Sequence, residues 1–316
     1  MFYLNSKSTD PYLNLAIEEV LLKNDRRDFL LLYINTPSVI IGKHQTAHKE
    51  ADTRFTFENN IPVIRRISGG GTVYHDKGNV NFSFITESKY GQQVDFIKYT
   101  TPVINFLRSQ GIDARFEGKN DIRVNGLKIS GNAEHVHRER VLHHGTLLFE
   151  TSLNGLGNSI RKDTSCYASR SVDSNPSRVT NLHEMLPDIQ NIDDLRERMI
   201  DYMVRAVTGM RSYEPDEIHL VNAKKLALEK YQTWEWNYAY GPEYHFRNRF
   251  RFNGEEHVCH LRIKDGIIVE SRIEGSPALT GVAERLKGCR HMPADISETI
   301  AKERSELCNL DIFSFF

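Results

Sequence analysis

The chain has 316 residues and a formal net charge of −1, with 41 Lys and Arg against 42 Asp and Glu. The length suits about two domains of ordinary size, and the balanced charge argues against a protein that coats nucleic acid non-specifically. The longest apolar run, residues 29–34, is far shorter than the about 18 to 20 residues that cross a bilayer. We therefore expect neither a nucleic-acid partner nor a membrane span.

The N-terminal residues and the cysteines predict the compartment. The first twelve residues lack a basic segment followed by an apolar stretch and a small-residue cleavage site, so nothing in them directs secretion. The cysteines show no CxxC pair and no metal-ligand spacing, which suits a reducing environment. They are Cys166, Cys259, Cys289 and Cys308. The sequence therefore predicts a cytoplasmic protein.

The first half of the chain alternates helix-like and strand-like segments. Apolar residues at helical spacing predict an amphipathic helix over 13–24, and two apolar runs at 29–34 and 38–42 predict strands joined by a turn. The further predicted elements are a surface helix over 49–60, strands over 62–67 and 72–86, a helix over 92–110, and strands over 121–125, 127–137 and 141–149. Because short turns link most of these strands, hairpins outnumber crossovers and the sheet should be largely antiparallel.

The second half begins with residues 151–178, which are rich in Asn, Gly, Ser, Asp and Pro and predict a long loop of the functional or mobile kind. The elements predicted after it are helices over 179–186, 191–209 and 221–233, strands over 245–252, 257–263 and 266–274, and helices over 278–287 and 295–307. The predicted fold is α+β, with mixed, largely antiparallel sheets flanked by helices. A catalytic domain over 1–242 would precede a small accessory α+β domain over 243–316.

Residues 65–76, RRISGGGTVYHD, form the most informative segment. Gly69, Gly70 and Gly71 allow positive φ angles and close approach to a ligand, and their N–H groups can converge on an anion. Arg65 and Arg66 precede them, which favours an anion-binding loop over a plain hairpin bulge. The segment lacks the spacing of a P-loop and of a Rossmann turn, so neither standard nucleotide motif applies.

A second segment, residues 120–133, contains a candidate catalytic lysine. Lys128 alternates with Leu127 and Ile129, so its ammonium projects from the opposite face of the strand, into solvent or into a pocket. Asp121 lies a short hairpin away. It could bind Mg²⁺, which favours carboxylate and phosphate oxygens, or form an Asx turn.

Three histidines complete the candidate residues. His143 and His144 are adjacent on a predicted strand and must point to opposite faces. We interpret one of them as packed in the core and the other as a contact to solvent or substrate. Neither this pair nor His75 suggests a metal site.

Six segments, in this order over residues 10–182, resemble the lipoate–protein ligases of the biotin/lipoate protein-ligase superfamily. They are DPYLNLAIEE at 10–19, SVIIGKHQ at 38–45, RRISGGGTVYHDKGN at 65–79, NDIRVNGLKISGNA at 120–133, HHGTLL at 143–148 and SRVTNL at 177–182. Residues 234–236, WEW, are similar to an element that the family carries before its C-terminal domain. That domain itself is matched by length and position alone.

The resemblance implies a two-step reaction. Lipoate and MgATP give lipoyl-AMP and pyrophosphate, and the acyl group then passes to a lysine of a lipoyl domain. The acceptor would be an acyltransferase subunit of a 2-oxoacid dehydrogenase or the glycine-cleavage H protein. Lys128 would be the catalytic residue, because its charge can serve the α-phosphate first and the acyl carbonyl afterwards. The predicted ATP and lipoyl-AMP contacts are Arg66, Ser68, Gly69, Gly70, Gly71, Thr72, Val73, Tyr74, Asn79, Lys128 and Arg178, with His75 and His144 for substrate and Asp121 for Mg²⁺.

Alternatives remain open at this point. Many relatives carry a second arginine where this chain has Pro176, so that Arg178 alone remains there; a transferase that uses preformed lipoyl-AMP is one alternative. A second is an octanoyltransferase with acyl-carrier protein as donor and a thioester on Cys166, which has no adjacent His or basic residue to lower its thiol pKa. A non-catalytic scaffold protein is the third, and Lys128 with the intact SGGG run argues against it.

Overall fold

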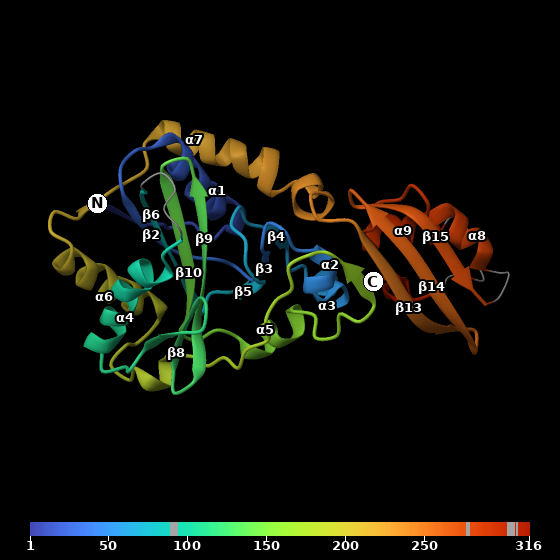
Figure 1. The fold of residues 1–316 in the computed structure, drawn as a ribbon, viewed down its shortest axis with the longest axis horizontal. Helices are drawn as coiled ribbons and strands as arrows, with labels where there is room; N and C mark the ends of the chain where they lie inside the picture. The colour runs from blue at the N-terminus through green and yellow to red at the C-terminus, as the bar shows by residue number, and fades with distance from the viewer. Residues whose placement is uncertain (89–93, 276–278, 302–306, 308) are drawn as a thin grey trace.

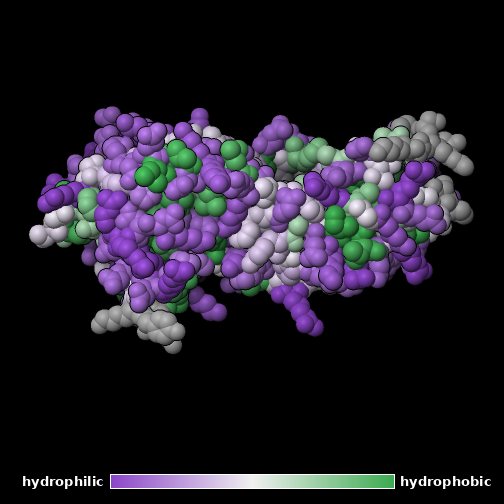
Figure 2. Space-filling view, turned by 90° about the horizontal axis from the view of Figure 1, so that it is seen from above, coloured by the Kyte–Doolittle hydropathy of each residue, from purple (hydrophilic) through white to green (hydrophobic). Residues whose placement is uncertain are grey.

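The computed structural model describes residues 1–88, 94–275, 279–301, 307 and 309–316. Figure 1 shows an elongated molecule, with the larger part built around a central sheet and a smaller C-terminal module at one end. Seen from above, the surface is mainly hydrophilic and its hydrophobic residues lie in small separate patches (Figure 2). Across the described residues, none of the helices has the length and apolar character that a membrane crossing requires.

An eight-stranded mixed sheet forms the centre of the larger part. Its strand order is β12-β1-β2-β6-β10-β9-β8-β7. The strands are β1 (Phe2–Asn5), β2 (Phe29–Ile34), β6 (Asn79–Glu87), β7 (Arg115–Glu117), β8 (Asp121–Val124), β9 (Leu127–His137), β10 (Arg140–Leu148) and β12 (Arg211–Ser212). Strand β1 runs parallel to β2 and β12, and the other pairs are antiparallel. The predicted α+β class with largely antiparallel sheets is confirmed.

Helices cover both faces of this sheet because its central strands are apolar on both sides. Along β2, Leu30 and Leu32 belong to one core, while Phe29 and Leu31 belong to the other. Helix α1 (Pro11–Asn24) packs in the second core, and α4 (Phe96–Ser109) and α6 (Ile192–Ala206) pack in the first. Asp10 caps α1 by accepting hydrogen bonds from the first-turn amides. The sheet is thus a middle layer, and the cavity described below opens where its strands meet the neighbouring small sheet.

That small sheet is three-stranded, with the order β4-β3-β5. Strand β3 (Ser38–Ile41) runs parallel to β4 (Val63–Arg65) and antiparallel to β5 (Val73–His75). The predicted strands at 29–34 and 38–42 both exist, but they lie in different sheets, so residues 35–37 lead from one sheet to the other. The glycine-rich segment connects β4 with β5.

Three local predictions were wrong. The surface helix over 49–60 is two short helices, α2 (Ala47–Glu50) and α3 (Thr53–Glu58), and α2 is buried. The loop over 151–178 contains α5 (Leu153–Ser159), capped by the Ser152 hydroxyl, and β11 (Tyr167–Ser169). The helix over 179–186 is a single 3-10 turn, η1 (His183–Met185). Helix α7 (Glu217–Leu226) continues through the π turns η2 (Ala227–Tyr231) and η3 (Glu235–Ala239).

The C-terminal module is an antiparallel sheet with the order β11-β13-β14-β15 and helices against it (Figure 1). Its elements are β13 (Tyr244–Phe252), β14 (Glu255–Lys264), β15 (Ile267–Glu274), α8 (Thr280–Leu286), α9 (Pro293–Ala301) and η6 (Ile312–Phe315). The predicted helices over 92–110, 278–287 and 295–307 lie partly outside the described residues. The division into 1–242 and 243–316 stays a prediction, and β11 joins this sheet from before that boundary.

Candidate active site

A cavity of about 550 Å³ lies between the two sheets of the larger part. The segments that line it are far apart in the sequence: residues 70–73, 118–121, 131–133, 144–146 and 172–177, with single residues from α1, β2, β3, β6 and α4. The predicted site residues that it brings together are Arg66, Gly70, Gly71, Thr72, Val73, His75, Asp121, Lys128 and His144. The predicted residues that do not line it are Ser68, Gly69, Tyr74, Asn79 and Arg178.

Two of those five residues, Tyr74 and Arg178, have side chains that lie away from the cavity. The Tyr74 ring packs in the small core beside β3, because successive residues of β5 point to opposite faces and Val73 and His75 face the cavity. The Arg178 side chain is exposed, and its carbonyl accepts the Lys128 amide at 2.9 Å. Neither side chain reaches the cavity.

Asn79 and Ser68 lie just behind the lining. The Asn79 side-chain amide donates to the Asn81 Oδ1 at 2.9 Å, and Asn81 is the residue that lines the cavity. The Ser68 hydroxyl lies 2.6 Å from Nε2 of His144, which also lines it. These two residues therefore support the cavity wall from outside.

Arg66 shapes the glycine-rich segment. Its guanidinium donates to the carbonyls of Ile40, Gly69 and Gly71 at 3.0, 2.6 and 2.7 Å, and to the Ser68 hydroxyl at 2.9 Å. Burial lowers the pKa of Arg66 to about 10, so the group remains positively charged at neutral pH. Arg66 thus gives the cavity a fixed cation and a fixed loop.

The glycines expose backbone amides to the cavity. Gly70 has a φ of 87°, a left-handed conformation that favours glycine. Gly70 and Gly71 both line the cavity, and among the described residues no acceptor takes a hydrogen bond from either amide. Gly70 is exposed and Gly71 is half-buried, so both N–H groups are accessible from the cavity and are suited to an anionic ligand.

Arg65, which the sequence places beside Arg66, has a different role. It is completely buried and outside the cavity lining, and its guanidinium donates to backbone carbonyls of the segment 42–45 and of η3. The Trp236 indole in turn donates to the Arg65 carbonyl at 2.6 Å. Arg65 therefore connects the segment 42–45 with η3, which follows α7 in the chain.

Lys128 extends into the cavity, where it is ion-paired. Its Nζ lies 2.8 Å from Oδ1 of Asp121, and Oδ2 of Asp121 lies 2.7 Å from Nη2 of Arg123. Arg123 also donates to the Ser177 hydroxyl at 2.7 Å, which connects this ion pair with the loop 172–177. A Cβ at Gly131 would lie 3.0 Å from the Lys128 Cε, so glycine leaves room for the lysine stem.

Glu18 is a site residue that the sequence prediction missed. Its buried carboxylate accepts from the Tyr33 hydroxyl at 2.9 Å and lies 3.1 Å from Nδ1 of His144. His144 and Tyr33 line the cavity. The sequence signal was available, because Glu18 follows Ile17 on a helix whose inner face is apolar, but the partners that satisfy its carboxylate come from other strands.

The two adjacent histidines point to opposite faces, as predicted. His144 lines the cavity, whereas His143 is completely buried behind it. His75 also lines the cavity and lies 3.0 Å from the Asn35 side-chain amide. Burial, with the nearby charge of Arg66, lowers the pKa of His75 to about 3, so its ring is neutral at neutral pH.

The acidic residues allow one limited metal role. Across the described ranges, no group of three or more His, Cys, Asp or Glu side chains is arranged to hold a metal ion. Mg²⁺ in nucleotide sites is commonly bound by one or two carboxylates together with substrate phosphates. The Asp121 carboxylate is the candidate, but its two oxygens are already paired with Lys128 and Arg123, so it would bind Mg²⁺ by sharing an oxygen with one of these cations. The remaining ligands would come from a bound nucleotide and water.

Cys166 does not line the cavity. Its Sγ lies 3.8 Å from the Asn248 Oδ1, and the residue packs against the core of the C-terminal module. Within the described part of the chain, Cys166, Cys259 and Cys289 are free thiols. The thioester alternative therefore has no geometric support.

Comparisons with known proteins show the family to which the chain belongs. Residues 10–204 match the family model of the lipoyl protein ligase A/B catalytic domain. The chain is 36% identical to lipoate–protein ligase 1 of Staphylococcus aureus over 95% of this chain and 93% of that protein. It is 37% identical to the lipoate-protein ligase LplJ of Bacillus subtilis, over 87% and 84%. The chain belongs to the lipoyl protein ligase A/B family. Within it, the chain is an enzyme of the lipoate–protein ligase type.

Solved structures share the fold. A T. acidophilum protein with bound lipoic acid has a TM-score of 0.63 and 28% identity over 74% of this chain and 98% of its own. A lipoate-protein ligase A bound with ATP has a TM-score of 0.63 and 28% identity over 75% and 97%. A bipartite lipoate protein ligase of Thermoplasma acidophilum, described with its E2 lipoyl domain, has a TM-score of 0.61 and 27% identity over 75% and 94%. The predicted resemblance and ligase function are confirmed.

Proposed function

We propose that the cavity activates lipoate with ATP and that the resulting lipoyl-AMP acylates a lysine of a lipoyl domain. The observation that carries this proposal is the position of the Lys128 ammonium on the same cavity as the unpaired amides of Gly70 and Gly71. Such an arrangement suits a ligand whose negative charge moves from a phosphate to an acyl oxygen. The lipoate-bound and ATP-bound neighbours support the choice of substrates.

In the first step, a carboxylate oxygen of lipoate bonds to the α-phosphorus of ATP while the bond to the bridging oxygen breaks and pyrophosphate leaves. The negative charge around the α-phosphorus meets Lys128, the glycine amides and the fixed charge of Arg66. Donors that are held in place before the reaction stabilise this charge without reorganisation.

In the second step, the neutral ε-amine of the acceptor lysine attacks the acyl carbonyl carbon, the bond to the phosphate oxygen breaks, and AMP leaves. The amine gives up a proton, and the new bond is an amide. We assign to Lys128 the stabilisation of the carbonyl oxygen in this step, because its ammonium lines the cavity. Because the acyl group goes directly from AMP to the acceptor, no protein thiol takes part.

Mg²⁺, when bound with the nucleotide, supplies charge neutralisation on the phosphates. We assign Asp121 as the carboxylate that would hold it, beside the Lys128 ammonium. The cavity lining ends at Ser177, so we propose that residues 1–242 carry the chemistry and that residues 243–316 form an accessory module.

The proposed acceptors are lipoyl domains of 2-oxoacid dehydrogenase acyltransferase subunits or the glycine-cleavage H protein. The T. acidophilum ligase described with its E2 lipoyl domain supports this class of partner. We further propose the cytoplasm as the compartment, since free thiols at the three described cysteines suit reducing conditions.

The mass of the acceptor tests the proposed function. The purified enzyme is incubated with lipoate, Mg²⁺ and an apo lipoyl domain, with and without ATP. The lipoyl adduct is expected when ATP is present. An acceptor mass that stays unchanged with ATP, lipoate and several lipoyl domains would contradict the proposal.

A further inference from the structure

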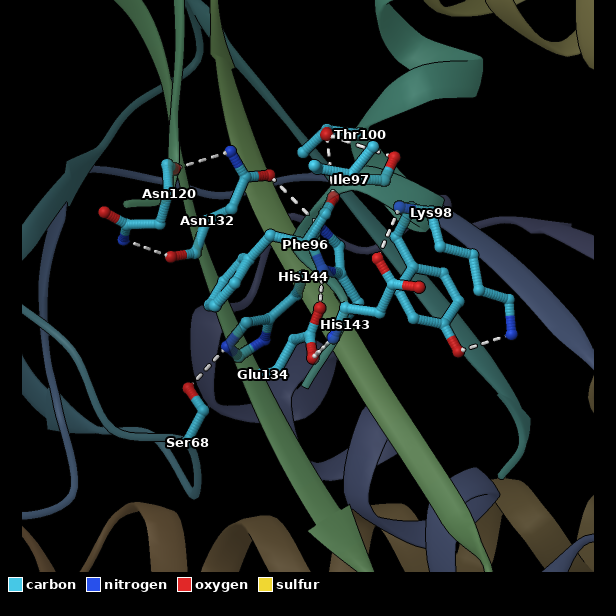
Figure 3. A network of polar contacts seen from close by, with 12 residues as sticks. Ser68, Phe96, Ile97, Lys98, Thr100, Asn120, Asn132, Glu134, His143 and His144 are labelled. Atoms are coloured by element: carbon cyan, nitrogen blue, oxygen red, sulfur yellow. Dashed lines mark hydrogen bonds and ion pairs between the residues drawn. The ribbon is translucent and has the colours of Figure 1, made fainter. Parts of the chain in front are cut away.

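His143, shown with its polar neighbours in Figure 3, is a buried histidine that takes no part in the reaction proposed above. His143 is completely buried on β10, and its Nδ1 lies 2.8 Å from Oε1 of Glu134, whose side chain is 1% exposed. The imidazole stacks on Phe82 and Tyr99, with ring centroids 6.2 and 5.1 Å apart. Burying a titratable pair such as Glu134 and His143 among aromatic rings costs free energy. We therefore expect this pair to have a function.

The second ring nitrogen of His143 contacts a residue that lines the cavity. Nε2 lies 3.2 Å from Oδ1 of Asn132, a residue that lines the cavity. The other end of this amide, Nδ2, lies 3.0 Å from the backbone carbonyl of Asn120. A carbonyl oxygen accepts and never donates, so the NH₂ group must face Asn120 and the oxygen must face His143. His143 must then donate from Nε2.

Asn132 connects the pair to the catalytic lysine. The Asn120 carbonyl accepts from both the amide and the side chain of Asn132, each at 3.0 Å, and the Asn120 side chain donates back to the Asn132 carbonyl at 2.5 Å. Asn120 directly precedes Asp121, whose carboxylate holds Lys128 at 2.8 Å. The orientation of the Asn132 side-chain amide thus helps to fix the turn at Asn120, which directly precedes Asp121, the partner of Lys128.

The hydrogen-bond pattern determines how many protons Glu134 and His143 hold together. An ionised Glu134 needs an N–H at Nδ1 of His143, and Asn132 needs an N–H at Nε2. An imidazolium beside a carboxylate satisfies both, and so does an Nε2-protonated imidazole beside a protonated Glu134. Each of these states holds one proton more than a neutral imidazole beside an ionised carboxylate. Without that proton, the Nε2 lone pair would face the Asn132 oxygen.

We propose that Glu134 and His143 form a positioning pair whose shared proton keeps the Asn132 amide oriented and thereby holds Asp121 against Lys128. The reading rests on the proposed function, since the ligase reaction is one of its readouts. The bond to Asn132 is present at low pH and is lost as the pH rises. Burial is the largest effect and lowers the pKa of His143 below its ordinary value, and the hydrogen bond to Glu134 counters part of that fall. The proposal therefore rests on the geometry, which requires an N–H at Nε2 and a proton between Nδ1 and Glu134.

The surroundings of His143 supply the other groups that act on this proton. The charged or titratable groups near the ring are Glu134 from β9, the α4 N-cap Asp95, Tyr99 from α4, and His144 from β10 itself. Lys98 lies against Tyr99, with its Nζ 4.8 Å from the centre of that ring. The Asp95 amide donates to the second oxygen of Glu134 at 3.0 Å. The amide of Asn132 also needs space, because a Cβ at Gly145 would lie 2.2 Å from its oxygen.

Three variants test the positioning role in the full-length protein. His143→Gln places a non-titrating NH₂ group near Asn132, and His143→Leu removes the donor. The control is His183→Gln, an exposed histidine outside the cavity lining. The measurements are the pH profile of pyrophosphate release from ATP and lipoate without acceptor, the melting temperature, and the ¹⁵N NMR signals of the labelled histidines, with His143→Gln identifying the His143 signals.

The wild type should show a protonated Nε2 on His143 at pH 7 and an activity that falls on the alkaline side. His143→Leu should lose on the order of 10²-fold in the single-turnover rate of pyrophosphate release, as expected for small misplacements of catalytic groups, while His143→Gln should keep more activity and lose the alkaline limb. An unprotonated Nε2 at pH 7, or wild-type rates and profile in folded His143→Leu, would overturn the proposal. A wild type without pyrophosphate release would instead refute the proposed function, and the NMR result would still decide the protonation.

Discussion

The Lys128 ammonium lies 2.8 Å from the Asp121 carboxylate inside the cavity. The second oxygen of that carboxylate is held by Arg123, so Asp121 is fixed from two sides. Lys128 is therefore held in position before a ligand enters. This preorganisation is what a catalytic cation needs, because no side-chain ordering is left for the moment of reaction.

Lys128→Ala should impair both half-reactions. Losing one preorganised donor typically costs about 10² to 10³ in rate, roughly 3 to 4 kcal/mol. The fold should change little, because Asp121 keeps its ion pair with Arg123. Pyrophosphate release and consumption of supplied lipoyl-AMP are measured separately, with Lys162→Ala as an exposed lysine control. Near-wild-type rates in both assays would place Lys128 outside the reaction.

Arg66→Lys should weaken nucleotide binding although it keeps the charge. Lysine cannot reproduce the planar guanidinium that reaches Ile40, Gly69 and Gly71 at once. We expect a KM for ATP raised at least about tenfold, together with a lower melting temperature, because buried carbonyls lose their donors. Unchanged KM and melting temperature would show that the glycine-rich segment keeps its shape without this arginine.

Cys166→Ser should leave the reaction unchanged. The thiol packs toward the C-terminal core and does not line the cavity. The expected rates of adenylation and transfer are those of the wild type within experimental error. A loss of transfer with intact adenylation would revive a thiol-dependent route.

Folding stability should fall as the pH is lowered from about 6.5 to about 4. Burial lowers the pKa of His291 to about 4, so the unfolded chain binds its proton at a higher pH than the folded chain does. Stability is then lost on acidification, by on the order of 3 kcal/mol for this one group. The free energy of unfolding is measured with urea at several pH values. It should fall less steeply with decreasing pH for His291→Gln than for the wild type. An equal pH dependence of the free energy of unfolding in both proteins would assign the acid sensitivity to other groups.

Local sequence patterns predicted the Lys128 hairpin well. Asn125 and Gly126 take positive φ angles at the turn, which sets the register that brings β8 beside β9. That register places Lys128 opposite Arg123 and Asp121 opposite Gly131, so the Asp121–Lys128 ion pair runs diagonally across the hairpin, next to a register shift between Ile122 and Arg123. A hairpin prediction therefore contained most of this part of the site. Arg66 and the glycines were found for the same reason, since their contacts are local.

The missed features depend on contacts between distant segments. Glu18 occupies a polar position within an ordinary amphipathic pattern, and its burial becomes evident when Tyr33 and His144 arrive from other strands. The separation of β2 and β3 into two sheets is likewise decided by their partners. Helix α5 was hidden by its Asn and Gly residues, and its cap at Ser152 was the main local signal.

The most direct test of the central claim is a reaction without any acceptor. The enzyme is mixed with ATP, Mg²⁺ and lipoate, and pyrophosphate and bound lipoyl-AMP are quantified before an apo lipoyl domain is added. We expect stoichiometric lipoyl-AMP with one pyrophosphate per enzyme, followed by transfer to the domain without further ATP. Transfer from supplied lipoyl-AMP with no pyrophosphate release from ATP would contradict the two-step reaction. The protein would then be a transferase that uses preformed lipoyl-AMP.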